Sequence, residues 1–152
     1  MTAFAIALAA AAAVAALSIV PRLLLRRAQD RLAARKLAED QPALMTRADL
    51  VTGRYRRAPG ILALTGAGVV FDGLFGETFK LSLADIRRIE TGNRLASGRR
   101  LLALEVLRLT PSAGDPAEFV LSPASAFAWR SHLGLWAVKE RQADADRVVP
   151  GR

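Results

Sequence analysis

The first 21 residues of the chain, MTAFAIALAAAAAVAALSIVP, contain no charged side chain, and the first charge is at Arg22. As a helix, the 18 residues from Ala3 to Val20 would span about 27 Å at roughly 1.5 Å per residue. The hydrocarbon core of a bilayer is about 30 Å thick, and the leucines at positions 23 to 25 lengthen the apolar stretch. We therefore predict one transmembrane helix over residues 1–21.

A secretory signal peptide is the alternative for this segment, but it needs a basic stretch before the apolar run, and none is present. The positive charge follows instead, because residues 22–40 contain six arginine or lysine residues and three acidic ones. The positive-inside rule then predicts a single-pass protein of the inner membrane, with its N-terminus outside and its C-terminal domain cytoplasmic. Whether the apolar segment is ever cleaved stays open.

Residues 22–41 are predicted to form a basic juxtamembrane helix that continues from the apolar segment. It should end before Pro42, since a residue that precedes proline avoids helical geometry. Two roles stay open for it: a basic helix lying on lipid headgroups, or a solvated spacer between membrane and domain. An apolar stripe near helical spacing, with arginines around it, runs through Leu25, Ala28, Leu32 and Leu37.

After a short linker over residues 41–47, apolar runs alternate with glycines and charges, as in an antiparallel sandwich or barrel. The run at 101–109 has apolar residues at adjacent positions and is therefore expected to be buried on both sides at its centre. The seven predicted strands are residues 50–56, 61–65, 69–72, 78–82, 86–91, 101–109 and 118–121.

The chain then changes to a helical pattern. Ser122 is a suitable N-cap and Pro123 suits the first helical position. A stripe with spacings of three, four and three is typical of a helix that caps a sheet: Ala126, Trp129, Leu133 and Trp136. We expect one folded domain over residues 42–141 and a disordered tail over residues 142–152.

The glycine-rich stretch GILALTGAGVVFDG, residues 60–73, does not match a phosphate-binding loop. Such a loop leads directly into a helix, whereas Gly66 and Gly68 are followed by Val69 and further strand-forming residues, with no lysine before Lys80. Glycine instead supplies the positive backbone angles of a tight turn. We predict a β-hairpin here.

No catalytic, cofactor or metal site is predicted. The single histidine, His132, is adjacent to Ser131 on one helix, where the two side chains cannot form a nucleophile–base pair. The carboxylates are scattered singly, and cysteine is absent, which agrees with a reducing compartment and excludes disulfides and cysteine-ligated metals. The net charge of +8 is not interleaved with aromatic residues. This disfavours nucleic acid as the partner and favours anionic lipid.

The order of these segments resembles the pleckstrin-homology (PH) superfamily, in particular its GRAM-like and bacterial members. The resemblance covers residues 46–141 and rests on GILALTGAGVVFDG, TFKLSLADIRRIETG, LLALEVLRL and EFVLSPASAFAWRSHL. It implies two roughly orthogonal antiparallel sheets, seven strands in all, capped by a C-terminal helix with an inward tryptophan. Trp129 matches that position, with Phe127 and Leu133 alongside.

The resemblance implies binding of phosphoinositides, other lipid headgroups, or a protein or peptide, and no catalysis. The first hairpin lacks the lysine-rich run of lipid-binding members, but basic candidates flank two loops: Arg54, Arg56, Arg57, Arg94, Arg99 and Arg100. We therefore expect a membrane-anchored module that docks on anionic headgroups or on a membrane-protein partner. The alternative is a structural subunit of a membrane complex, assembled through the small residues Ala9, Ala12, Ala13 and Ala16.

Overall fold

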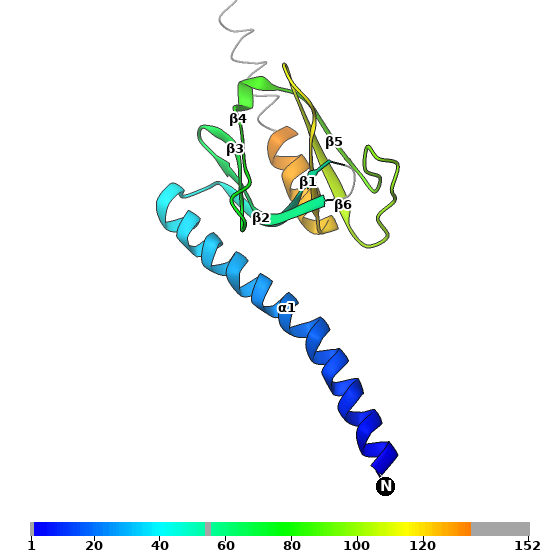
Figure 1. Cartoon of the computed structure of the whole chain (residues 1–152). Helices are drawn as coiled ribbons and strands as arrows, with labels where there is room; N and C mark the ends of the chain where they lie inside the picture. Colours follow the sequence, from blue (N-terminus) through cyan, green and yellow to red (C-terminus); the bar gives the residue numbers. More distant parts are fainter. Residues whose placement is uncertain (1, 54–55, 135–152) are drawn as a thin grey trace, which may run out of the picture.

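The structure is a computed structural model that describes residues 2–53 and 56–134, with side chains from residue 19 onward. The long helix α1 (Thr2–Asp40) leads into a sheet that curls around a second helix (Figure 1). α1 continues through Pro21 and ends two residues before Pro42, close to the predicted end. Gln41, with a positive φ of 42°, turns the chain into the sheet.

Seven antiparallel strands form one curled sheet in the order β4-β3-β2-β1-β7-β6-β5. The short 3-10 helix η1 (Leu83–Asp85) joins β4 to β5. The prediction of a mostly β domain with seven antiparallel strands and a C-terminal helix is thus confirmed. The two separate sheets that the resemblance implied were wrong, because β1 pairs with both β2 and β7 and joins all strands into one sheet. The strands are β1 (Leu44–Thr52), β2 (Arg56–Thr65), β3 (Gly68–Gly73), β4 (Thr78–Leu81), β5 (Ile86–Gly92), β6 (Glu105–Pro111) and β7 (Ala117–Leu121).

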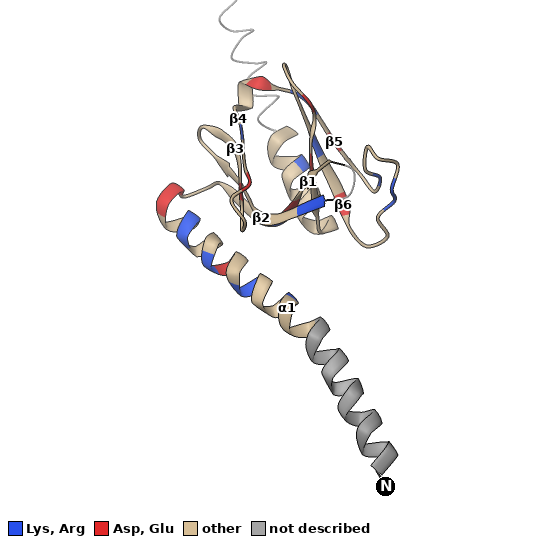
Figure 2. Cartoon of the chain, viewed as in Figure 1, with Lys and Arg blue, Asp and Glu red and all other residues tan. Residues whose placement is uncertain are grey.

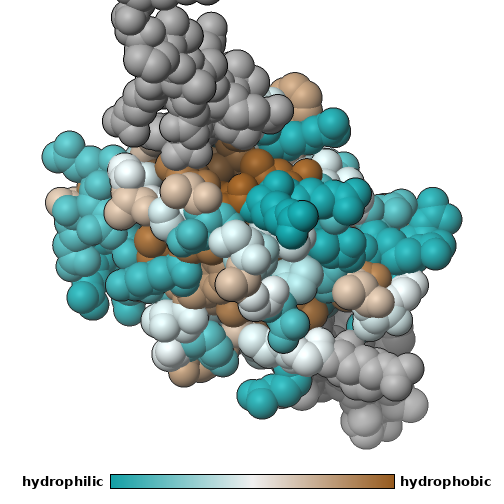
Figure 3. Space-filling model, turned by 90° about the horizontal axis from the view of Figure 1, so that it is seen from above, coloured by the Kyte–Doolittle hydropathy of each residue, from teal (hydrophilic) through white to brown (hydrophobic). Residues whose placement is uncertain are grey.

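The core lies between the concave face of the sheet and the C-terminal helix. Phe119 is fully buried there, with ring centroids 5.7 Å from Phe71 and 5.4 Å from Phe79. Burying a large apolar side chain contributes about 1.5–3 kcal/mol, so this cluster is a main source of stability. Partly buried apolar residues surround it. Seen from above, apolar surface gathers near the centre of the molecule and polar side chains frame it (Figure 3).

The C-terminal helix, residues 123–134, has the predicted cap and inward face. Ser122 Oγ accepts a hydrogen bond of 3.2 Å from the backbone N–H of Ser125, which satisfies one free donor of the first turn. Trp129 and Leu133 are 0 % and 1 % exposed, whereas Trp136 and the tail 142–152 lie outside the described residues. Phe127 was expected beside Trp129 but is 73 % exposed, because two residues along a helix point to opposite sides.

The predicted linker over residues 41–47 was partly wrong. β1 begins at Leu44 and pairs along its whole length with β2, from Leu44 opposite Leu64 to Thr52 opposite Arg56. Three of the six residues of the segment LMTRAD are polar, and Thr46 and Arg47 are adjacent, so it has little strand signal until β2 lies beside it. The first strand therefore starts earlier than predicted, and it also ends earlier, at Thr52. Arg56, which was predicted to end it, begins β2 instead.

The predicted strand at 101–109 was also wrong in its first half. β6 begins only at Glu105, and Leu102 is 98 % exposed while Leu101 is 7 % exposed. An apolar run predicts burial, but here the run lies partly in a loop that turns one leucine inward and the next outward.

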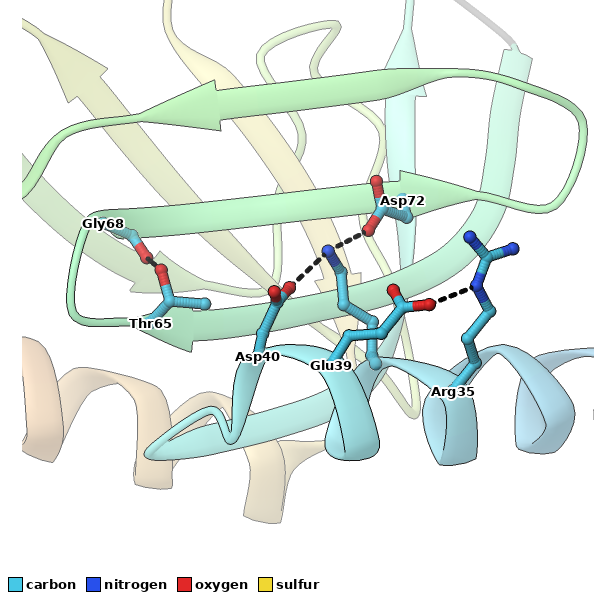
Figure 4. A network of polar contacts seen from close by, with 7 residues as sticks. Arg35, Glu39, Asp40, Thr65, Gly68 and Asp72 are labelled. Atoms are coloured by element: carbon cyan, nitrogen blue, oxygen red, sulfur yellow. Dashed lines mark hydrogen bonds and ion pairs between the residues drawn. The ribbon is translucent and has the colours of Figure 1, made fainter.

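The glycine-rich stretch is a hairpin between β2 and β3, as predicted, with Thr65 opposite Gly68. Thr65 Oγ1 donates a hydrogen bond of 3.1 Å to the carbonyl of Gly68 (Figure 4). Gly68 has a φ of +142°, and a side chain there would collide with the backbone of Leu81. The expected positive φ was wrong for Gly66, which has open space around it and no positive φ.

Candidate functional site

Helix α1 is fastened across the outer face of the sheet by one polar contact to each of three strands. Asp30 pairs with Arg47 on β1, and Gln29 Nε2 donates a hydrogen bond of 3.2 Å to the carbonyl oxygen of Gly60 on β2. Lys36 Nζ lies 2.6 Å from Asp72 Oδ2 on β3 and 2.8 Å from Asp40 Oδ2 (Figure 4). These contacts fix both the position and the direction of the helix on the domain.

Apolar packing accompanies these contacts. Ile61 and Ala63 alternate with the core-facing residues of β2 and so point to the outer face, yet they are 1 % and 0 % exposed. α1 contacts β2 there, and Gln29 is itself buried. Over this stretch the helix therefore lies on the sheet, where the sequence had suggested headgroups or solvent. Leu37, which the sequence placed on the apolar stripe, is 55 % exposed.

Two titratable groups near this junction have shifted pKa values. Partial burial of the Lys36 amine lowers its pKa, but the hydrogen bonds to Asp40 and Asp72 outweigh this, so the pKa is raised overall. Burial raises the pKa of Asp49 on β1, and the positive charge of Arg57 opposes that rise only in part. The positive charge of Lys36 is therefore stabilised by two carboxylates, whereas the fold disfavours the charged form of Asp49.

The second half of the outer face is covered by a small hairpin, residues 93–101, which we call the arginine hairpin. The backbone N–H of Leu95 donates to the carbonyl of Arg99 over 3.0 Å, and that of Leu101 donates to Asn93 over 2.7 Å. Below them, Leu95 and Leu101 join an apolar cluster with Val51, Val106 and Val120, which come from β1, β6 and β7. The hairpin is thus packed on the sheet and is not a free loop.

Glu118 on β7 fastens this hairpin. Its Oε1 accepts hydrogen bonds of 2.9 Å from the backbone N–H of Ala96 and 2.9 Å from Nε of Arg108, which is its cross-strand partner on β6. Glu118 is 7 % exposed, so a buried carboxylate is satisfied by a charged partner and a backbone donor. Sequence reasoning missed this residue because its partners are ten and 22 positions away.

The predicted basic residues fall into two neighbouring places. The backbones of Arg94 and Arg100 pair in an isolated antiparallel β-bridge across the arginine hairpin. Both side chains are exposed, as is that of Arg99. Arg56 is exposed and Arg57 half-buried at the start of β2, while Arg54 lies outside the described residues. Figure 2 shows basic residues on the hairpin and at the start of β2.

These two places are adjacent in space. A surface cavity of about 440 Å³ is lined by Val51 and Gly53 from the end of β1 and by Ala96 and Ser97 from the hairpin. The structure therefore brings the arginine hairpin close to the end of β1, which pairs with Arg56 and Arg57 on β2. Their role in binding stays a prediction.

Directly after the hairpin come Leu102, Ala103 and Leu104, which we call the leucine tip. Leu102 and Leu104 are 98 % and 39 % exposed. Leu104 lines a cavity of about 570 Å³ together with Arg26 of α1 and Asp49 of β1, so the tip lies near the helix. Just before Arg26, α1 exposes four large apolar residues around the exposed Arg22: Ile19, Val20, Leu23 and Leu24.

Among the described residues, no cluster of acidic or histidine side chains has a composition and size that would hold a metal ion. Nδ1 of His132 lies 3.0 Å from the carbonyl oxygen of Ala128, one turn back in the same helix. Within the part of the chain whose side chains are described, no helix is long and apolar enough to cross a membrane. The segment predicted to do so, residues 1–21, lies outside that part except for its last three residues.

A comparison of the chain with protein-family models gave no match, and a comparison with curated proteins gave none either. The fold is therefore the basis on which the chain can be compared with a known superfamily. It is a seven-stranded antiparallel half-barrel capped by a C-terminal helix, and it is compatible with a PH-like fold.

Proposed function

We propose that this chain is a non-enzymatic binding module whose PH-like domain is anchored to a membrane by residues 1–21 and docks on anionic lipid headgroups. The anchor is supported by the charge-free sequence and by the basic residues that follow it. The same charge distribution supports a cytoplasmic domain at the inner membrane. The strand order and the helix inside the curl support a place in the PH superfamily, whose members bind and do not catalyse.

The observation that carries the proposal is the fastening of α1 to the sheet. A domain on a flexible linker samples many orientations, whereas three contacts to three strands hold this domain at one angle to its helix. The exposed apolar side chains of α1 begin at Leu24, between one and two helical turns before Gln29, where the fastened stretch starts. If that apolar end enters a bilayer, the outer face of the sheet stands close to the headgroups and little orientational freedom is lost on docking.

The arginine hairpin supplies the attraction. Each basic side chain near an anionic surface contributes about 1 kcal/mol. Screening confines this effect to roughly 8–10 Å at physiological salt, so only residues held near the surface count. Arg94, Arg99 and Arg100 are exposed on a hairpin that packs on the sheet, on the side where the leucine tip approaches α1.

The test uses the full-length chain in lipid nanodiscs, either wholly zwitterionic or with anionic lipid added. Amide hydrogen exchange over residues 93–104 should slow when anionic lipid is present. Replacing Arg94, Arg99 and Arg100 together by glutamine should abolish that protection. The matched control removes three exposed positive charges elsewhere, from Lys80 on β4, Arg87 on β5 and Arg130 on the C-terminal helix, and should leave the protection intact.

Two results would contradict the proposal. Extraction of the chain from membranes by alkaline carbonate would refute the anchor. If exchange over residues 93–104 is the same in both lipid compositions, headgroup docking is refuted. The surface would then be assigned to a protein partner.

A further inference from the structure

The leucine tip is an exposed apolar feature on a firmly held support. Leu102 is 98 % exposed, and exposed leucines that occur singly on a surface need no explanation. Here a second leucine, Leu104, is also exposed two positions along, and the last residue of the hairpin, Leu101, is buried in the outer cluster. The contact from Ala96 to Glu118 further restrains the hairpin before the tip. The tip therefore projects from a fixed base.

The position of the tip matches the place where α1 becomes apolar. Leu104 and Arg26 line the same cavity, so this part of the tip lies beside the helix at the level of Arg26. Two residues earlier, Leu24 is 58 % exposed, and Leu23 beside it is 50 % exposed. In Figure 1 the loop that carries the hairpin and tip lies on the same side of the domain as the N-terminal half of α1.

The charge around the tip favours a lipid surface as its occupant. Residues 93–104 contain three arginines and no acidic residue, which is complementary to anionic headgroups. The long aliphatic stem of arginine allows its charge to stay at headgroup level while neighbouring leucines go deeper. Apolar surface next to positive charge is the pattern of segments that lie in the membrane interface.

We propose that Leu102 and Leu104 enter the interfacial layer of the bilayer beside α1, with the three arginines of the hairpin at the headgroups. This inference rests on the proposed function, and it adds a second point of contact with the membrane. Two contacts, the helix and the tip, prevent the domain from tilting about α1. Removal of the apolar surface of the leucines from water supplies the driving force.

The chain contains no cysteine, so a single cysteine can carry a fluorescent label whose emission depends on the polarity around it. The test places this label at Leu102→Cys in the full-length chain, reconstituted in vesicles that contain anionic lipid. The control is Ala84→Cys in η1, which is exposed and follows β4 at the end of the domain away from the N-terminal half of α1 (Figure 1). Both positions are exposed, so neither label should disturb folding.

At position 102 we expect emission shifted to shorter wavelength and quenching by lipids that carry a quencher on the acyl chain. At position 84 we expect emission as in water and quenching by iodide. A label at 102 that iodide quenches as fully as the one at 84, in chain that resists carbonate extraction, refutes the tip while the anchor stands. Shielding at 102 that disappears when the chain is diluted with excess lipid would show a contact between two copies and would also refute it. Release of the chain by carbonate refutes the anchor itself.

Discussion

The outer face of the sheet is covered in two different ways. α1 lies over β1, β2 and β3, and it is held by ion pairs, by one side-chain amide and by packing on the buried side chains of Ile61 and Ala63. Over β1, β7 and β6 lies the arginine hairpin, held by an apolar cluster and by buried Glu118. The ion pair between Asp30 and Arg47 is half exposed, and such pairs contribute only about 0–1 kcal/mol. We therefore expect the hairpin, whose carboxylate Glu118 is buried and paired, to be the firmer of the two covers.

The largest effect is expected from a change in the core beneath the sheet on which both α1 and the arginine hairpin lie. Trp129→Ala should lower the free energy of unfolding by about 3–5 kcal/mol, because it leaves a cavity between the helix and the sheet. That is a large part of a typical domain stability of about 5–15 kcal/mol. Chemical denaturation measures it, with exposed Phe127→Ala on the same helix as the control. Equal midpoints for the two variants would mean that the helix does not cap the core.

Next in size is the contact that fastens the hairpin. Glu118→Ala should cost about 1–3 kcal/mol, since it leaves the N–H of Ala96 and the guanidinium of Arg108 without their acceptor. The amide of Ala96 should also exchange faster with solvent. Asp115→Ala, at an exposed position nearby in the chain, controls for the loss of a carboxylate. Unchanged exchange at Ala96 would show that the apolar cluster alone holds the hairpin.

A smaller effect is expected for the helix cover. Gln29→Ala removes the hydrogen bond to Gly60 and should cost about 0.5–1.5 kcal/mol. Arg31→Ala, exposed on the same helix, serves as the control and should have little effect. The comparison between the covers fails if Gln29→Ala destabilises the chain more than Glu118→Ala does.

The smallest effect concerns Asp49, whose pKa the fold raises through burial. A raised pKa means that the folded state binds more protons than the unfolded state just above the ordinary value of about 3.9. Stability is therefore lost as the pH rises from that value through the folded pKa. Asp49→Asn should escape this loss and be slightly more stable than the parent at neutral pH, with a smaller difference below pH 4. Thermal unfolding at both pH values measures it, and an equal difference at both would contradict the assignment.

The arginines of the candidate surface could be predicted from the sequence, but the packing of the hairpin that carries them could not. The arginines at positions 94, 99 and 100 stood out beside a glycine, and they are exposed as a binding role requires. That they sit on a hairpin packed against three strands could not be predicted, because its apolar partners Val51 and Val120 are distant in the chain. The exposure of Leu102 was hidden for a similar reason, since an apolar run predicts burial.

The order and type of the elements follow from local signals in the sequence. Glycine at 68 specified a turn, the spacing of Ala126, Trp129 and Leu133 specified an inward helix face, and Pro42 marked the end of α1. These signals act within a few residues, through backbone sterics and side-chain periodicity. Long-range packing set which face of the sheet α1 covers, and it set that Leu101 is buried while Leu102 meets solvent. Those choices depend on pairs such as Gln29 with Gly60, 31 residues apart, which form once strand register has brought distant segments together.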